Sequence, residues 1–358
     1  DCSGYRVPQL EREALISFYN STGGGTDWTG TFWDTDANGL SNVGAWEGVT
    51  TGLINGQKHV IKIALYKNLN GSVPSEIKDL TELQELNIGY SSNSKGITEL
   101  KPEIGQLSKL ARLDLSGHDL SSLPTEIGDL SSLVYLNVSN NELSSLPIGI
   151  GNFTMLEELH LEYQEIYDVN TGIRTKTLTT LPDEIGNIAS LKKLYLQNNK
   201  LTSLPSTIGG LSSLEELRLS AYNSSGNELT SLPLEIGNLS NLKLLYVGDN
   251  SLTGLPDEIG NLSNLEDLYI GENRTYNPST GEYTYTLTTL PSTINNLTSL
   301  KTFRANNNHI TGDVDLSNLL ALTHIEFYEN RITGLKVGGS PNRFPNGHFY
   351  FKNNPKLI

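Results

Sequence analysis

The sequence predicts an α/β solenoid, a right-handed superhelix with a parallel, concave β-sheet on one side and short helices or turns on the convex side. Three observations lead to this fold class. A box of the type "LPxEIGxL" recurs along the chain, each box is followed by "xxLxxLxL", and an asparagine usually comes next in "xxNxLxxLP". Self-similarity at a period of roughly 20–50 residues is typical of repeat architectures.

The isoleucine of the box gives the length of the repeating unit. Successive isoleucines are 23 residues apart, or 23 residues plus an addition of 4, 12, 5 or 12 residues. A constant step places each isoleucine at the same point of its turn, and the additions interrupt the period. The nine positions are Ile77, Ile104, Ile127, Ile150, Ile185, Ile208, Ile236, Ile259 and Ile294.

Each turn offers one short strand and then a capping residue. In residues 194–196, "LYL", alternation along the strand directs both leucines to one side and the residue between them to the other. The asparagine that follows can cap backbone groups between neighbouring turns, as at Asn141, Asn199, Asn250 and Asn308. Other residues take this position in some turns, namely Ser91, His118, Gln164 and Tyr222. The proline that opens the box suits the first turn of a short helix, because its missing N–H is unpaired there anyway.

These residues resemble the leucine-rich repeat family, whose core is LxxLxLxxNxL. The resemblance extends from about Val60 to the end in about twelve turns, and it assigns residues 59–358 to one array. It implies parallel strands on the concave face, helical segments outside, and an extended binding surface. It also implies a non-catalytic recognition module rather than an enzyme, although a fold alone does not define a function. A protein is the leading partner, and a glycan is the alternative.

Residues 1–58 lack the repeat and form a predicted N-terminal helical cap. The stretch "PQLEREALISFYNSTGGG" has an apolar stripe at helical spacing and ends at glycines. With "AWEGVTT" it resembles the cap of secreted plant and bacterial leucine-rich repeat proteins, without the cysteines of the plant form. The resemblance implies a secreted or cell-surface protein of bacterial type. The stripe consists of Leu10, Ala14, Leu15, Phe18 and Tyr19.

Composition excludes several classes of function. The 25 basic and 40 acidic residues give a net charge of −15, which disfavours nucleic acid because affinity for phosphate backbones requires clustered lysine and arginine. No apolar run approaches the roughly 20 residues of a transmembrane segment. The single cysteine, Cys2, excludes an internal disulfide framework and a CxxC metal site. We expect no cofactor, and we expect the natural protein to continue beyond Ile358, since the final strand pattern ends without a polar cover.

The sequence contains two candidate metal sites, both weak. Alternation places Glu158, His160 and Glu162 on the concave face, but no second histidine or cysteine accompanies them, so a solvated surface is the favoured interpretation. The segment "DTDANGL" has the start of a calcium loop, and Ala45 stands where an EF-hand needs a bidentate glutamate. An ordinary cap loop remains the alternative there. The calcium candidates are Asp34, Asp36 and Asn38.

The residue between the two strand leucines forms the candidate binding surface. Five successive turns place tyrosine or arginine there, the residue types enriched in binding hot spots. Tyrosine also suits strands intrinsically, so strand propensity remains an alternative explanation. The five residues are Tyr195, Arg218, Tyr246, Tyr269 and Arg304. For a glycan, the tyrosines could stack on a sugar ring while Asn198, Asn306 and Asn307 bind its hydroxyls.

The two twelve-residue additions share the ending "LTTLP" and align with each other without a gap. Each contains turn formers, "NTG" or "PSTG", followed by alternation, "RTKT" or "YTYT", which predicts β-hairpins near residues 165–178 and 274–287. One hypothesis is that the hairpins flank a groove and bind ligand through Arg174, Lys176, Tyr283 and Tyr285. Neutral drift in loop length is the alternative, because longer loops cost little.

Overall fold

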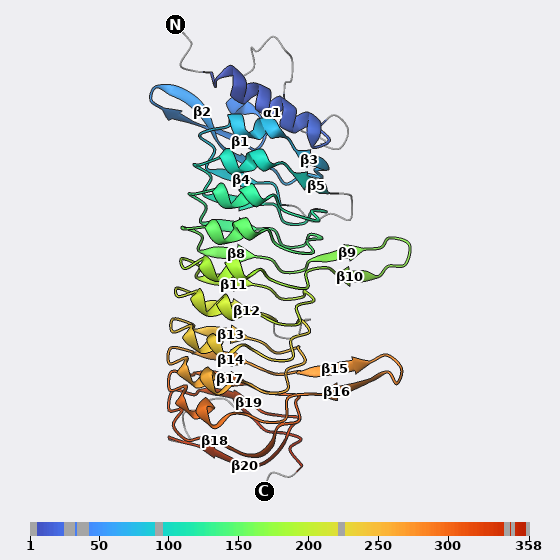
Figure 1. Cartoon of the computed structure of the whole chain (residues 1–358), viewed down its shortest axis with the longest axis vertical. Helices are drawn as coiled ribbons and strands as arrows, with labels where there is room; N and C mark the ends of the chain where they lie inside the picture. Colours follow the sequence, from blue (N-terminus) through green and yellow to red (C-terminus); the bar gives the residue numbers. More distant parts are fainter. Residues whose placement is uncertain are drawn as a thin grey trace. The chain divides into compact units, whose positions relative to one another are not determined.

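The computed structural model describes residues 6–24, 33, 43–89, 96–220, 226–339, 344 and 348–355. The chain divides into two compact units, Asp1–Leu178 and Thr179–Ile358, and each unit is a leucine-rich solenoid segment (Figure 1). The division falls inside the repeat array rather than at residue 58. Within the described ranges, no helix is both long enough and apolar enough to span a bilayer.

The first unit begins with its only long helix among the described residues, and repeated strands and 3-10 helices follow. Its elements are α1 (Gln9–Ser21), η2 (Val43–Ala45), β1 (Val49–Ile54), β2 (Gln57–Ala64), β3 (Gly71–Val73), η3 (Ser75–Asp79), β4 (Glu85–Asn87), β5 (Ile97–Leu100), η4 (Pro102–Gln106), β6 (Arg112–Asp114), η5 (Thr125–Asp129), β7 (Tyr135–Asn137), η6 (Ile148–Asn152), β8 (Glu158–His160), β9 (Glu165–Tyr167) and β10 (Arg174–Lys176). Strand β1 pairs antiparallel with β2, and β2, β4, β6, β7 and β8 then pair in parallel.

The second unit repeats one strand and one 3-10 helix per turn for most of its length. Its elements are η7 (Asp183–Asn187), β11 (Lys193–Tyr195), η8 (Ser206–Gly210), β12 (Glu216–Arg218), η9 (Leu234–Asn238), β13 (Leu244–Tyr246), η10 (Asp257–Asn261), β14 (Asp267–Tyr269), β15 (Arg274–Asn277), β16 (Glu282–Tyr285), η11 (Ser292–Asn296), β17 (Thr302–Arg304), β18 (Thr311–Leu316), β19 (His324–Glu326), β20 (Arg331–Val337) and β21 (Phe349–Tyr350). Strands β11, β12, β13, β14, β17, β19 and β21 pair in parallel in this order.

The 23-residue period is visible in the core of both units. In β11, Leu194 is fully buried between half-buried Lys193 and Tyr195, and most of the other repeat strands show the same burial pattern. All nine box isoleucines are buried. The proline of the box precedes its helix in an extended conformation, and its carbonyl accepts the N–H of the isoleucine, as Pro182 does from Ile185 at 3.1 Å. The box proline therefore starts its 3-10 turn from just outside it, except in η4, where Pro102 is the first residue and Lys101 precedes it.

Buried amides join neighbouring turns at the end of each strand. The Asn141 side chain accepts the N–H of Leu120 at 3.0 Å and donates to the carbonyls of Leu115 and Val138 at 2.9 and 3.0 Å. Gln164 makes equivalent bonds to Leu143 and Val138. These bonds satisfy backbone groups that the short strands leave unpaired, which is why a buried polar side chain is stable here.

Histidine also serves as a capping residue. The Nε2 of His118 lies 2.8 Å from the Ile88 carbonyl, and its Nδ1 accepts the N–H of Ile97 at 3.3 Å. Burial lowers the pKa of His118, so the ring is neutral and can accept at Nδ1. Tyr222, predicted at this position, lies outside the described residues, and in the same turn Asn227 accepts the N–H of Leu201 and donates to the Leu196 carbonyl. The five-residue addition thus precedes the capping residue of its turn.

The N-terminal helix α1 packs against η3 and β3. Ala14, Leu15 and Phe18 are buried as predicted, but Leu10 is 61% exposed, and Glu11 takes the buried place in the first turn. A Glu11 oxygen accepts the N–H of Val60 at 2.7 Å, and the other lies 2.5 Å from Nδ1 of His59. Desolvation raises the pKa of Glu11, partly offset by these two hydrogen bonds. A carboxylate therefore ties the helix to β2.

Both twelve-residue additions contain an antiparallel hairpin, and Figure 1 shows each one projecting from its own unit. The first pairs β9 with β10, and the second pairs β15 with β16. The two have the same attachment. Thr177 donates its N–H to the Gln164 carbonyl at 2.9 Å and its hydroxyl to the Leu143 carbonyl at 2.8 Å. Thr286 makes the matching bonds to Asn273 and Leu252 at 2.9 and 2.8 Å.

Candidate functional site

The candidate binding residues of the second unit lie in one row. The strand face is defined here as the side of the parallel strands that bears the residues flanking the buried leucines. Its central positions are in register across seven strands, so each residue lies beside the next. We call this row the central ladder, and it consists of Tyr195, Arg218, Tyr246, Tyr269, Arg304, Glu326 and Tyr350. The first five were predicted from sequence, and Glu326 and Tyr350 extend the row.

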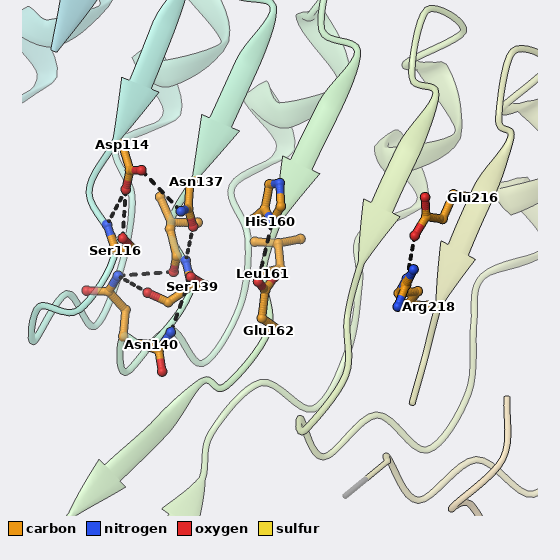
Figure 2. Close-up of polar contacts among 12 residues, drawn as sticks. Asp114, Ser116, Asn137, Ser139, Asn140, His160, Leu161, Glu162, Glu216 and Arg218 are labelled. Atoms are coloured by element: carbon orange, nitrogen blue, oxygen red, sulfur yellow. Dashed lines mark hydrogen bonds and ion pairs between the residues drawn. The ribbon is translucent and has the colours of Figure 1, made fainter. Parts of the chain in front are cut away.

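The first part of the central ladder alternates aromatic and cationic groups. The guanidinium of Arg218 lies 5.7 Å from the ring centroid of Tyr195 and 5.1 Å from that of Tyr246. It also pairs with Glu216 on its own strand (Figure 2). Because the ion pair and two rings hold the guanidinium, Arg218 presents a fixed planar surface between two tyrosines.

The next part of the ladder is a chain of hydrogen bonds and ion pairs. The Tyr246 hydroxyl donates to Asp267 at 2.9 Å, and Arg304 donates to the same carboxylate at 3.0 Å. Arg304 also lies 3.4 Å from Glu326, whose carboxylate is 2.6 Å from Nε2 of His324. Burial and the Asp267 charge raise the pKa of Tyr246, which keeps its hydroxyl protonated as a donor. These side chains are ordered before any ligand arrives, so binding to them would cost little conformational entropy.

Tyr269 does not belong to the exposed surface, and its prediction as a ligand-contacting residue was wrong. It is 1% exposed. Its ring covers Gly248 and Gly271, where an added Cβ would lie 2.6 Å from Cζ and 2.7 Å from Cε2. Its hydroxyl donates to Asp249 at 2.9 Å. The two glycines provide the space that lets the ring lie flat, so Tyr269 supports the strand face instead of projecting from it.

The carboxyl group of Asp249 has the most strongly shifted pKa of the described acidic residues. Its pKa is raised to about 7, mainly by burial and less by the nearby Glu272 charge, while the Tyr269 hydroxyl bond and the Arg274 charge oppose the shift. The backbone of Asp249 has a positive φ of 49°. Asparagines occupy the equivalent place, also with positive φ, at residues 140, 198, 307 and 353. An aspartate at this place therefore has both a partly buried carboxyl group and a backbone conformation that suits asparagine.

The strand face of the first unit has a different character. Arg112 lies 3.5 Å above the Tyr135 ring, which packs 5.2 Å from the His160 ring. Asp114 accepts hydrogen bonds from Ser116 and from Asn137 (Figure 2). These contacts are short-range and self-satisfied, so this face offers fewer aromatic anchors than the second unit.

The residues predicted to bind a metal or a glycan do not form a site among the described residues. His160 lies 3.3 Å from Glu162, and Figure 2 shows this contact, but no group of three or more metal-ligating side chains forms anywhere in the described ranges. The calcium candidates Asp34, Asp36 and Asn38 fall outside the described residues. Asn198 and Asn306 are buried, and Asn307 bonds to Glu272. Of the asparagines predicted to bind a sugar, two are thus buried and the third is bonded within the protein, and the buried Asn306 Oδ1 has no hydrogen-bond partner.

The hairpin residues are more accessible. Arg174 is exposed, pairs with Glu165 and lies 5.0 Å from the Tyr167 ring centroid, while Lys176 is half-buried. Tyr283 is 53% exposed, and Tyr285 is half-buried against His309. Sequence reasoning missed an apolar surface on the first hairpin, although hydrophobic residues within an insertion were a signal for it. The exposed residues of this surface are Ile166, Tyr167, Val169 and Ile173.

Comparisons with known proteins agree with this geometry. The family description "Leucine-rich repeat region" matches residues 59–173, "Leucine Rich repeats (2 copies)" matches 189–235, and "Leucine Rich Repeat" matches 241–262. A leucine-rich repeat protein of Leptospira interrogans is 31% identical, with 79% of this chain and 67% of that chain covered and a TM-score of 0.59. The chain belongs to the leucine-rich repeat family.

Two plant receptors share the fold. The Arabidopsis receptor kinase HAESA, solved with the peptide hormone IDA and the co-receptor SERK1, is 24% identical, with 92% and 53% coverage and a TM-score of 0.67. The plant peptide hormone receptor RGFR1, solved in complex with RGF2, is 26% identical, with 87% and 55% coverage and a TM-score of 0.53. The chain thus spans about two thirds of the Leptospira protein and just over half of these receptors. No curated protein matches the chain significantly.

Proposed function

We propose that the chain is a non-catalytic recognition module that binds an extracellular protein or peptide. The central ladder of the second unit is the observation that carries this proposal. Its side chains combine tyrosine and arginine, the residues most enriched in binding hot spots, and they are held in place by mutual contacts. A ligand that lies along the ladder would meet aromatic surface and oriented polar groups from turn to turn.

The comparisons support the ligand class and the location. RGFR1 was solved with a peptide hormone ligand and matches most of this chain. The Leptospira protein supports a bacterial origin, and a secreted or surface location fits a module of this kind. The sequence proposal that the hairpins take part in binding is retained for each hairpin separately, because both expose apolar or aromatic side chains away from the core.

Ligands for the test can be selected from a displayed library of random peptides with the unmodified protein. The variant Tyr195→Ala/Arg218→Ala/Tyr246→Ala removes three half-buried anchors while leaving the buried leucines in place. We expect its affinity for the selected peptides to fall at least about a hundredfold, since each anchor contributes about 1 kcal/mol or more. Calorimetric titration measures the affinity, and circular dichroism verifies the fold.

A matched control triple lies on the 3-10 side of the same unit. Asp183→Ala/Leu234→Ala/Asp257→Ala changes three exposed residues at the starts of η7, η9 and η10. This variant should bind normally. Equal affinity of the ladder triple and the control triple would refute the proposal.

The role of each hairpin is tested by deleting its twelve added residues, which restores a 23-residue turn. Ligands that contact a hairpin should lose at least about tenfold in affinity, or about 1.4 kcal/mol. Undiminished affinity in both deletions would assign the hairpins to drift in loop length.

A further inference from the structure

A cavity of about 380 Å³ lies at the base of the second hairpin, within the second unit. We call it the foot cavity, and its lining includes Tyr285, His309, Glu329, Asn330, Arg331 and Asn353. Tyr285 ends β16, and Arg331 begins β20. The cavity therefore forms where the hairpin rejoins the solenoid, at the ends of strands that also carry the capping asparagines.

One wall of the foot cavity is aromatic. The rings of Tyr285 and His309 lie 5.0 Å apart and are inclined by 46°. Both residues are half-buried. Burial and the nearby Arg331 charge lower the pKa of His309, so its ring is neutral at pH 7 and has one donor and one acceptor nitrogen.

The polar wall contains an unsatisfied cation. The second unit has four described arginines, and Arg218, Arg274 and Arg304 each pair with a carboxylate. Arg331 forms no ion pair with any described residue and is exposed. Asn353 donates to Glu329 beside it. A guanidinium that forms no ion pair stands out in a chain with a net charge of −15, although the Glu329 carboxylate lines the same cavity. A bound carboxylate is its natural bidentate partner.

The aromatic surface continues from the cavity along one face of the hairpin. Tyr283 lies two residues before Tyr285 on β16, and Tyr276 is its direct partner on β15. Side chains two residues apart on a strand, and directly opposite pairs, share one face. The Tyr276 and Tyr283 rings lie 5.1 Å apart, both about half exposed, and Arg274 packs 4.2 Å from the Tyr283 ring.

We propose that the foot cavity and this tyrosine face bind an acidic oligosaccharide. A uronic acid ring stacks on Tyr285, its carboxylate pairs with Arg331, and the next sugar rings lie on Tyr283 and Tyr276. The apolar face of a pyranose suits an aromatic ring, and its hydroxyl groups suit the amide, carboxylate and imidazole side chains of the cavity.

A peptide is the less favoured occupant of this cavity. Main-chain pairing with a free strand edge is one common way for an extended peptide to bind. The foot cavity is lined by side chains of turns and strand ends, with a row of rings beside it. The sugar site is separate from the central ladder, so it adds a second ligand to the proposed function and does not depend on it.

The probes are tetragalacturonic acid and its full methyl ester, which differ in charge but not in ring structure. Calorimetric titration of the unmodified protein should show saturable binding of the acid and at least about tenfold weaker binding of the ester. Arg331→Gln should weaken binding of the acid to the level of the ester and leave the ester unchanged. Tyr285→Ala should weaken the binding of both probes, while Tyr285→Phe, which keeps the ring, should preserve their binding.

Lys336→Gln is the matched control, because it removes one positive charge from the same strand, where Lys336 pairs with Asp315. It should bind the acid normally. Absence of saturable binding of the acid, or equal loss in Lys336→Gln and Arg331→Gln, would overturn the proposal. An acetylated tetrapeptide with a free terminal carboxylate provides the last arm: Arg331-dependent binding of this peptide without binding of the sugar would assign the cavity to peptides instead.

Discussion

Asp249→Asn should make the protein more stable at neutral and alkaline pH. Burial raises the pKa of Asp249 from its ordinary 3.8 to about 7. At about 1.4 kcal/mol per pH unit, this difference corresponds to at most about 4 kcal/mol of destabilisation when the carboxylate is charged. Asp249 is only partly buried, so solvent screening reduces the expected effect to about 1–2 kcal/mol. Asparagine also tolerates the positive φ and can still accept the Tyr269 hydroxyl.

The sign of the pH dependence follows from proton binding. Between about pH 4 and pH 7 the folded state holds a proton on Asp249 that the unfolded state has released, so stability falls as the pH rises. Below about pH 4 the carboxyl is protonated in both states, and the variant gains almost nothing. The stability advantage of Asp249→Asn should therefore grow from near zero at pH 4 to its full value at pH 8.

Thermal unfolding at pH 4, 6 and 8 measures this advantage. For a unit of this size, about 1–2 kcal/mol corresponds to a rise in Tm of about 2–8 °C at pH 8. Asp267→Asn is the control, because it removes a charge from the same face that pairs with Arg304 and should lower Tm. A Tm of Asp249→Asn that is unchanged at pH 8, or raised equally at all three pH values, would refute the reasoning.

Three further predictions concern the core. Leu194→Ala should destabilise by about 2–5 kcal/mol because it leaves a cavity in a fully buried row, and an unchanged Tm would contradict the assigned register. Gly248→Ala should cost about 1–3 kcal/mol because its Cβ would displace the Tyr269 ring, whereas Gly254→Ala, which meets no atom within 4 Å, should be neutral in the same melting experiment. Glu11→Ala should destabilise by about 1–3 kcal/mol by leaving a buried backbone N–H unpaired, and urea denaturation should show a lower midpoint.

The regular parts of this fold could be predicted from sequence because they depend on local spacing. A leucine such as Leu194 and the box isoleucines fall at fixed steps, and each step closes one turn of the solenoid. The hairpins were predictable for a similar reason, since "NTG" and "PSTG" lie between alternating segments. Neighbouring strands pair at equal registers, so the central ladder also followed from the period.

The departures depend on contacts between turns, which a single turn does not encode. Tyr269 occupies the same position as Tyr246, and only the glycines in its own and the preceding turn allow it to lie flat and become buried. The predicted apolar stripe does not include Glu11, because the burial of Glu11 depends on a backbone N–H and on His59, both supplied by β2. Arg331 gave no signal in sequence, because its significance lies in forming no ion pair with any described residue, although Glu329 lines the same cavity.

The threonines that attach the two hairpins have a consequence for how this protein can change. Thr177 and Thr286 each bond a carbonyl of the preceding turn and a carbonyl at the start of the insertion. These bonds join the two ends of each insertion at the solenoid, so the rest of the insertion is not needed to close the turn. The residues beyond this closure can vary in sequence and length at little energetic cost, since loop entropy grows slowly with length. The solenoid therefore provides one attachment geometry for different insertions. Exchanging the hairpin held by it offers a route to new binding specificity without redesign of the core.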